Sequence, residues 1–166
     1  MTDIHPTAII HPDAEIGENV FIGPFCNIGK YTRLGNGVQL YSHVVVEGHT
    51  TIGEDSRIFP FASIGTIPQD LKYKGENTKA EIGENCKIRE YVTVNLGTSG
   101  GGGLTKIGKN CLLMVGTHIA HDCIIGENVI FANHSTLAGH VIIEDNVVVG
   151  ALSAIHQFSR VGEGAM

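Results

Sequence analysis

The sequence repeats every six residues over most of its length, and this period constrains the fold more than any other feature. The first position of each hexad is aliphatic, as at Ile4, Ile10 and Ile16, and the fifth is small, as at Ala8 and Ala14. A period of six fits neither a heptad coiled coil nor an amphipathic helix, and β-branched residues dominate the inward positions. Each hexad is therefore predicted to form one short strand followed by a bend.

Three such strands complete a triangular turn, and successive turns stack as parallel strands roughly 4.8 Å apart. The length predicts about nine turns in a single domain spanning residues 1–166. Glycine is frequent at the second position, as at Gly17, Gly83 and Gly150, where we expect it to supply a bend with φ > 0. Parallel crossovers are usually right-handed, but this hexapeptide pattern resembles the left-handed parallel β-helix, a known exception.

Two segments interrupt the repeat, and insertions in solenoids often carry function. They are residues 66–80 (TIPQDLKYKGENTKA) and residues 95–106 (NLGTSGGGGLTK). The glycine run of the second segment resembles a phosphate cradle, but no Gly-Lys-Ser/Thr follows it, so a P-loop is not expected. We predict two excursion loops, the second of them flexible.

The charge distribution limits the partners. The net charge of −6 argues against nucleic acid, because binding phosphates requires a basic surface. Residues 72–109 nevertheless hold seven of the eleven basic residues against four acidic ones, which makes this segment +3 and the remainder −9. Such a basic belt suits an acidic partner or a nucleotide diphosphate. Scattered solvated lysines are the alternative.

Neither a signal peptide nor an apolar run of roughly 18 residues is visible, so a cytoplasmic protein without a membrane span is expected. All cysteines occupy fifth positions of hexads, where Ala, Ser, Thr and Val otherwise stand. We expect packing residues rather than a disulfide framework or a zinc cluster. The four are Cys26, Cys86, Cys111 and Cys123.

Polar residues recur at a spacing that stacks them. Residues one 18-residue turn apart lie on the same side of the coil, which predicts a column of His121, Gly139 and Gln157. His140 and His156 adjoin this column.

Such a column contains the groups that acyl transfer requires. His121 could take a proton from an attacking hydroxyl, and the neighbouring Asp122 could fix its tautomer. The N–H of Gly139 could bind the oxyanion of a tetrahedral intermediate. His118 lies three residues before His121, near the preceding corner. The spacing alone leaves open a second interpretation, in which these polar residues merely line a groove.

Five segments together resemble one enzyme family, the UDP-N-acetylglucosamine O-acyltransferases of lipid A biosynthesis. They are THIAHDC (117–123), LAGHV (137–141), AIHQF (154–158), IPQDLKYKGE (67–76) and GGGLTKIG (101–108). The resemblance covers essentially the whole chain. It implies a left-handed β-helix and a homotrimer with active sites between subunits. It also implies transfer of an (R)-3-hydroxyacyl group from acyl carrier protein to the sugar's 3-position, without a metal or cofactor.

The resemblance also implies residue roles. His121 is then the general base, Asp122 its orienting partner and Gly139 the oxyanion donor. Further residues are expected to contact the sugar nucleotide or the acyl donor: Asp70, Lys72, Asn95, His118, His140, His156 and Gln157.

Two departures from the family pattern stand out. The family commonly has His-Arg where this chain has Asn95 and Leu96, and we predict a changed acceptor preference, toward the analogue with a 3-amino group. The chain also ends at Met166 in mid-repeat, without the family's C-terminal helical domain, which indicates a fragment with an uncapped solenoid end.

Two rival functions remain at this stage. A zinc hydrase of the γ-carbonic-anhydrase type uses the same coil but needs three converging imidazoles. His134, a candidate third ligand, is expected on a different side of the coil from His121. The other rival is a scaffold without catalytic activity.

Overall fold

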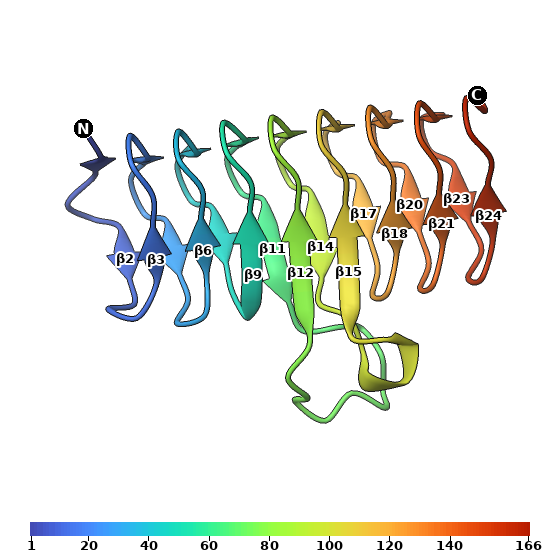
Figure 1. The fold of residues 1–166 in the computed structure, drawn as a ribbon, viewed down its shortest axis with the longest axis horizontal. Helices are drawn as coiled ribbons and strands as arrows, with labels where there is room; N and C mark the ends of the chain where they lie inside the picture. The colour runs from blue at the N-terminus through green and yellow to red at the C-terminus, as the bar shows by residue number, and fades with distance from the viewer.

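The computed structural model describes residues 1–166 and shows a three-sided prism of parallel β-strands (Figure 1). Three parallel sheets of eight strands each form its sides, here named sheets A, B and C. Each coil contributes one strand to each sheet, so the prism has eight coils. The predicted all-β, left-handed parallel β-helix is confirmed. No helix of the structure has the length and apolar character that crossing a bilayer requires.

The strands are short, mostly of two residues. Sheet A contains β1 (Asp3–Ile4), β4 (Phe21–Ile22), β7 (Gln39–Leu40), β10 (Arg57–Ile58), β13 (Lys87–Ile88), β16 (Leu112–Leu113), β19 (Ile130–Phe131) and β22 (Val148–Val149). Sheet B contains β2 (Ile9–Ile10), β5 (Asn27–Ile28), β8 (Val45–Val46), β11 (Ser63–Thr66), β14 (Thr93–Asn95), β17 (His118–Ile119), β20 (Thr136–Leu137) and β23 (Ala154–Ile155). Sheet C contains β3 (Glu15–Ile16), β6 (Arg33–Leu34), β9 (His49–Ile52), β12 (Lys79–Ile82), β15 (Leu104–Ile107), β18 (Ile124–Ile125), β21 (Ile142–Ile143) and β24 (Arg160–Val161).

The core is a linear column built from the first and fifth positions of the hexads, as the repeat predicts. A single cluster of 31 buried apolar residues runs through the prism. The cysteines are free and buried within it, which confirms their reading as packing residues. Because each coil contacts only its neighbours, stability is distributed along the stack.

The prediction for the glycines is wrong. Positive φ occurs at the fourth position of the hexads, for example at Asn19 (φ 55°), Asp55 (φ 56°) and Tyr91 (φ 60°), and not at the glycines for which it was predicted, Gly17, Gly83 and Gly150. Close approach of the coils explains those glycines instead. A Cβ on Gly83 would lie 2.6 Å from the backbone of the next coil at Gly108. The second position therefore needs a missing side chain rather than an unusual φ.

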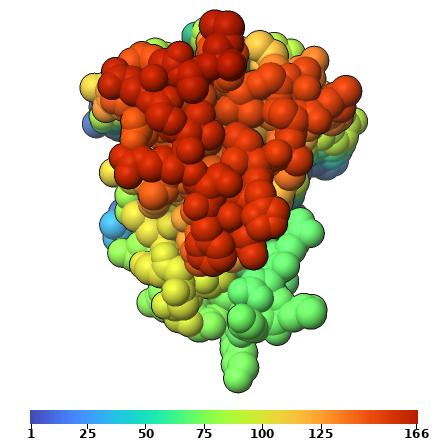
Figure 2. All heavy atoms as spheres, turned by 90° about the vertical axis from the view of Figure 1, so that its right-hand side faces the viewer, coloured from blue at the N-terminus to red at the C-terminus, as the bar shows by residue number.

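Both excursion loops leave the prism at the same corner, where sheet B passes into sheet C (Figure 1). The first, residues 67–78, joins β11 to β12, and the second, residues 96–103, joins β14 to β15. Their residues are lost to the coils, which is why eight coils form rather than about nine. Viewed along the prism from its C-terminal end, the first loop projects beyond the outline of the coils (Figure 2).

The second loop is ordered, contrary to the expectation of a flexible segment. It contains the single 3-10 turn η1 (Ser99–Gly101), and its Thr98 is buried. The Gly97 N–H donates to the Lys79 carbonyl, and the Lys79 N–H donates to the Gly103 carbonyl. Both ends of the loop are thus tied to β12.

The basic residues of segment 72–109 surround the middle of the prism instead of forming one patch. Lys87 lies on sheet A and Lys106 on sheet C. Two of the basic residues are neutralised by ion pairs, Arg89 with Glu90 at 2.9 Å and Lys109 with Glu127 at 3.4 Å. The basic belt is therefore weaker than the sequence alone indicates.

Candidate active site

The candidate residues meet at the corner between sheets B and C, in the coils that follow the two loops. The pairing of Ile119 with Leu137, and of Leu137 with Ile155, sets the 18-residue stacking that the sequence predicts. The turns after β17, β20 and β23 bring together His121 and Asp122, then Gly139 and His140, then His156 and Gln157. The column therefore exists, but it lies along an edge of the prism rather than on one of its sides.

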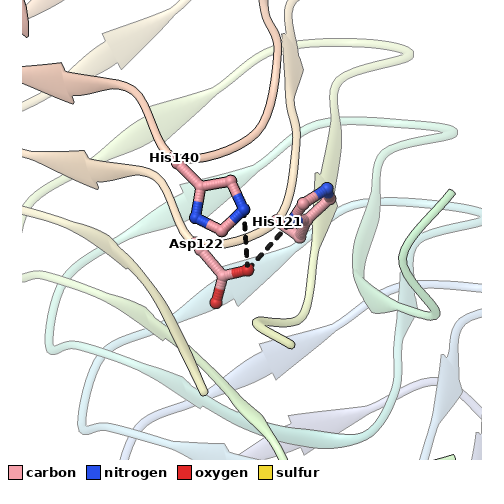
Figure 3. A group of neighbouring side chains, drawn as sticks. All are labelled: His121, Asp122 and His140. Carbon is pink, nitrogen blue, oxygen red and sulfur yellow. Dashed lines mark hydrogen bonds and ion pairs between the residues drawn. The ribbon is translucent and has the colours of Figure 1, made fainter. Parts of the chain in front are cut away.

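His121 and Asp122 form a hydrogen-bonded dyad (Figure 3). The His121 Nδ1 lies 2.8 Å from the Asp122 Oδ2, and the side chains are 15% and 0% exposed. Since a carboxylate accepts, His121 Nδ1 carries the proton and donates it. The lone pair of the neutral ring is then on Nε2, the atom that a general base needs free.

Gly139 lies directly beneath the ring of His121. A Cβ at this position would be 2.5 Å from the ring's Cε1 and 2.7 Å from its Nε2, so only glycine leaves room for the imidazole. The Gly139 N–H donates no hydrogen bond within the chain. At the equivalent turn position Glu127, the N–H donates to the Asp145 side chain at 2.7 Å. The residue that carries this unpartnered N–H therefore packs against the His121 ring, whose Nε2 has no hydrogen-bond partner either.

The second loop supplies contacts to Asp122 that the sequence analysis missed. The Thr98 N–H donates to Asp122 Oδ1 at 2.8 Å, and the Thr98 hydroxyl donates to Oδ2 at 2.6 Å. The Asp122 N–H donates to the Thr105 hydroxyl oxygen at 2.9 Å. The only sequence signal for these contacts is the position of both threonines within the second interruption of the repeat.

His140 borders the dyad from the next coil. Its Nε2 lies 3.9 Å from Asp122 Oδ2, and its ring meets that of His121 edge-on, with centroids 5.0 Å apart (Figure 3). On its other side the ring stacks on Phe158 at 4.6 Å. His140 is thus held in place by Phe158, which the sequence analysis did not single out.

His118 lies on the preceding strand and is half-buried. Its Nδ1 is 2.7 Å from the Thr93 hydroxyl. Burial, and secondarily the charge of nearby His121, lower the pKa of His118 below its ordinary value. His118 is therefore favoured in its neutral form beside the dyad.

Three further candidates form no hydrogen bond or ion pair with the dyad. Asp70 and Lys72 are on the first loop, where the Asp70 carboxylate accepts the Lys72 N–H at 2.9 Å. Asn95 is buried at the end of β14, and its amide donates to Thr66 and to the Ile67 carbonyl. The structure therefore places Asn95 against the base of the first loop.

The side chains around the dyad do not include the three converging imidazoles expected for a γ-carbonic-anhydrase-type metal centre. Ligand atoms of His121, Asp122 and His140 lie within 4.8 Å of one another, which gives two imidazoles and not three. The Asp122 Oδ2 already accepts from His121 and Thr98. His134 lies at another corner, between sheets A and B, against Gly116.

Comparison with known proteins agrees with this fold. Residues 104–139 match the family model "Bacterial transferase hexapeptide (six repeats)". Over 109 residues, 66% of this chain, the sequence is 59% identical to the acyl-[acyl-carrier-protein]--UDP-N-acetylglucosamine O-acyltransferase of Paracoccus denitrificans, and it covers 42% of that protein.

Solved structures give the same result over a longer alignment. LpxA from Acinetobacter baumannii superposes with a TM-score of 0.94 and 56% identity, covering 95% of this chain and 61% of that one. The UDP-N-acetylglucosamine acyltransferase of Campylobacter jejuni gives 0.95 and 46%, covering 98% and 63%.

The fold defines the class first: the chain is a parallel β-helix, and its residues 104–139 match the hexapeptide repeats of bacterial transferases. Within this class it is a relative of the UDP-N-acetylglucosamine acyltransferases, so the resemblance seen in its motifs is confirmed. The chain spans less than two thirds of the length of these relatives.

Proposed function

We propose that the protein is an acyltransferase that moves an (R)-3-hydroxyacyl group from acyl carrier protein to the 3-position of a UDP-N-acetylglucosamine-type sugar nucleotide, as a cytoplasmic enzyme of lipid A synthesis. One observation carries the proposal. The Nε2 of a His121 whose Nδ1 is held by Asp122 lies directly over Gly139, whose N–H has no partner in the chain. The named relatives support the substrate class.

These groups fit the chemistry of acyl transfer from a thioester. His121 Nε2 removes the proton of the acceptor hydroxyl as its oxygen attacks the acyl carbon, a role typically worth 10²–10⁴-fold. The Gly139 N–H stabilises the resulting oxyanion, which is typically worth about 3 kcal/mol. The C–S bond then breaks, and the proton on His121 passes to the leaving sulfur. Asp122 stabilises the imidazolium in between.

The surface beside the dyad can receive the donor. Ile124 and Ile142 pair on the outer face of sheet C, and each is 39% exposed. Ile124 lies two residues after Asp122 in the sequence. In the sheet, Ile124 lies between Ile142 and Lys106, which pairs with it from the preceding coil. We assign the acyl chain to this apolar strip and the acidic carrier protein to the lysines near it.

The dyad lies on an outward corner of the prism, which gives a substrate only one wall. A second wall is needed to enclose the reactants, because acyl transfer in open water would compete with hydrolysis. We therefore propose a homotrimer in which a neighbouring subunit closes the cleft.

The acceptor group is the finer part of the proposal. Asn95 carries a buried Oδ1 without a hydrogen-bond partner, and Leu96 beside it is apolar, so this position offers an acceptor and no cation. An amine donates more hydrogens than a hydroxyl. This supports the 3-amino sugar analogue as the preferred acceptor, with an amide as the product.

The test is acyl transfer by the purified protein with both acceptors and a hydroxyacyl carrier protein. We expect His121→Ala to abolish transfer without changing the circular dichroism spectrum. His5→Ala, which alters an exposed histidine of the first coil, is the matched control and should retain activity. Full activity of His121→Ala would overturn the role of the dyad, and absence of transfer by the unaltered protein would overturn the proposed function and leave the scaffold interpretation. Preference for the 3-hydroxyl sugar would reject only the acceptor assignment.

A further inference from the structure

The second loop closes over the dyad with two contacts to the same carboxylate. The Thr98 N–H holds Oδ1 of Asp122 at 2.8 Å, and the Thr98 hydroxyl holds Oδ2 at 2.6 Å. His121 Nδ1 donates to this same Oδ2 at 2.8 Å. Asp122 is 5% exposed and Thr98 6% exposed, so water does not replace these bonds readily.

The two contacts fix the rotation of the carboxylate. A carboxylate held at one oxygen can turn about its Cβ–Cγ bond, whereas one held at both oxygens cannot. Because Oδ2 is the atom that binds His121, the Thr98 hydroxyl determines where the ring's partner lies. Hydrogen bonds to a charged group are among the stronger ones in proteins, and a buried charged group that loses a partner is penalised further.

The loop itself is stiff at Thr98. The Thr98 carbonyl accepts the N–H groups of Gly101 and Gly103, at 3.0 and 2.8 Å. Gly101 packs directly on the Asp122 carboxylate, and a Cβ there would overlap the carboxylate atoms. The glycines of this loop thus allow it to lie close against Asp122, which accounts for the Gly-rich segment without any phosphate.

We propose that Thr98 is a positioning residue of the reaction: it fixes the Asp122 carboxylate, and through it the tautomer and orientation of His121. This inference rests on the proposed acyltransferase function. The inference extends the proposed function by giving the second excursion loop a role in it. This loop leaves one coil and contacts the next coil, where His121 and Asp122 lie.

The test compares three variants of the protein. Thr98→Val keeps the shape and backbone N–H but removes the hydroxyl, and Thr98→Ser restores a hydroxyl. Ser99→Ala is the control, because the Ser99 hydroxyl lies in the same loop but binds Glu76 at 3.1 Å and not the dyad. We expect kcat of Thr98→Val to fall roughly 10- to 100-fold with little change in KM, since only one charge-assisted hydrogen bond is lost. Thr98→Ser should recover most of it.

A second measurement does not depend on activity. With ¹⁵N-labelled histidine, NMR of the native protein should show His121 as one tautomer with the proton on Nδ1. Thr98→Val should give a mixture of both tautomers, and Ser99→Ala should not.

The outcomes separate the two claims. An unchanged tautomer and unchanged kcat in Thr98→Val would overturn the positioning role. A lowered kcat with an unchanged tautomer would also overturn it, because the effect would then be structural. A changed tautomer in a protein that transfers no acyl group would support the positioning role and reject the proposed function instead.

Discussion

Replacing Gly83 by Ala tests why glycine occupies the second position of the hexads. The added Cβ would lie 2.6 Å from the carbonyl carbon of Gly108 and from the nitrogen of Lys109 in the next coil. Carbon atoms in favourable contact are about 3.5–4.0 Å apart. The two coils must therefore separate locally by roughly 1 Å.

This separation carries an energetic penalty that can be estimated. The Gly83 N–H donates to the Ile107 carbonyl at 2.8 Å, and a shift of about 1 Å breaks this hydrogen bond, which is worth about 1 kcal/mol. Overpacking adds about 1–3 kcal/mol. We expect the unfolding free energy to fall by about 3 kcal/mol, which lowers Tm by about 6–12 °C at this chain length.

Gly29 provides the matched control. It occupies the same hexad position without positive φ, and the nearest atoms to a Cβ there are the Glu47 Cα and the Val46 carbonyl oxygen at 3.3 Å, against 2.6 Å at Gly83. Gly29→Ala is expected to change the unfolding free energy by less than about 1 kcal/mol, since its neighbours need to move little and alanine reduces the entropy of the unfolded chain. Thermal unfolding followed by circular dichroism compares the two. An equal loss of stability in both variants would show that backbone conformation, and not coil spacing, selects glycine.

Three further predictions concern other parts of the chain. Burial lowers the pKa of His118, so the unfolded chain binds a proton there at higher pH than the folded chain does. The contribution of His118 to stability should therefore be complete above about pH 6.5 and be lost as the pH falls below it. In urea unfolding, His118→Gln should show a weaker dependence of the unfolding free energy on pH. Gly101→Ala should push the second loop off Asp122 and lower acyl transfer at least as much as Thr98→Val; undiminished activity would contradict the close packing. All four thiols are buried, and burial raises the pKa of Cys123 to about 11. Ellman's reagent should therefore modify none of the thiols in the native protein and all of them after denaturation. Rapid reaction of the native protein would contradict the burial of Cys26, Cys86, Cys111 and Cys123.

The repeat alone determined the architecture, because a hexad pattern is local and each coil packs only on its neighbours. A period of 18 residues per turn also determined the stacking of His121 over Gly139, since identical coils leave no other alignment. The positions of the two interruptions, and the burial of the cysteines, followed from the same reading.

Other features depended on contacts that no repeat encodes. The prediction that the second-position glycines supply positive φ was wrong. The bend, and not the residue type, sets φ and the distance to the next coil. The sequence likewise gave no reason to connect Thr98 with Asp122. Their separation of 24 residues is not a multiple of the repeat's turn, and only the folded second loop carries the threonine across to the next coil. A regular solenoid can be read from its sequence, but the contacts made by a segment that leaves the solenoid are long-range, and the tertiary structure decides them.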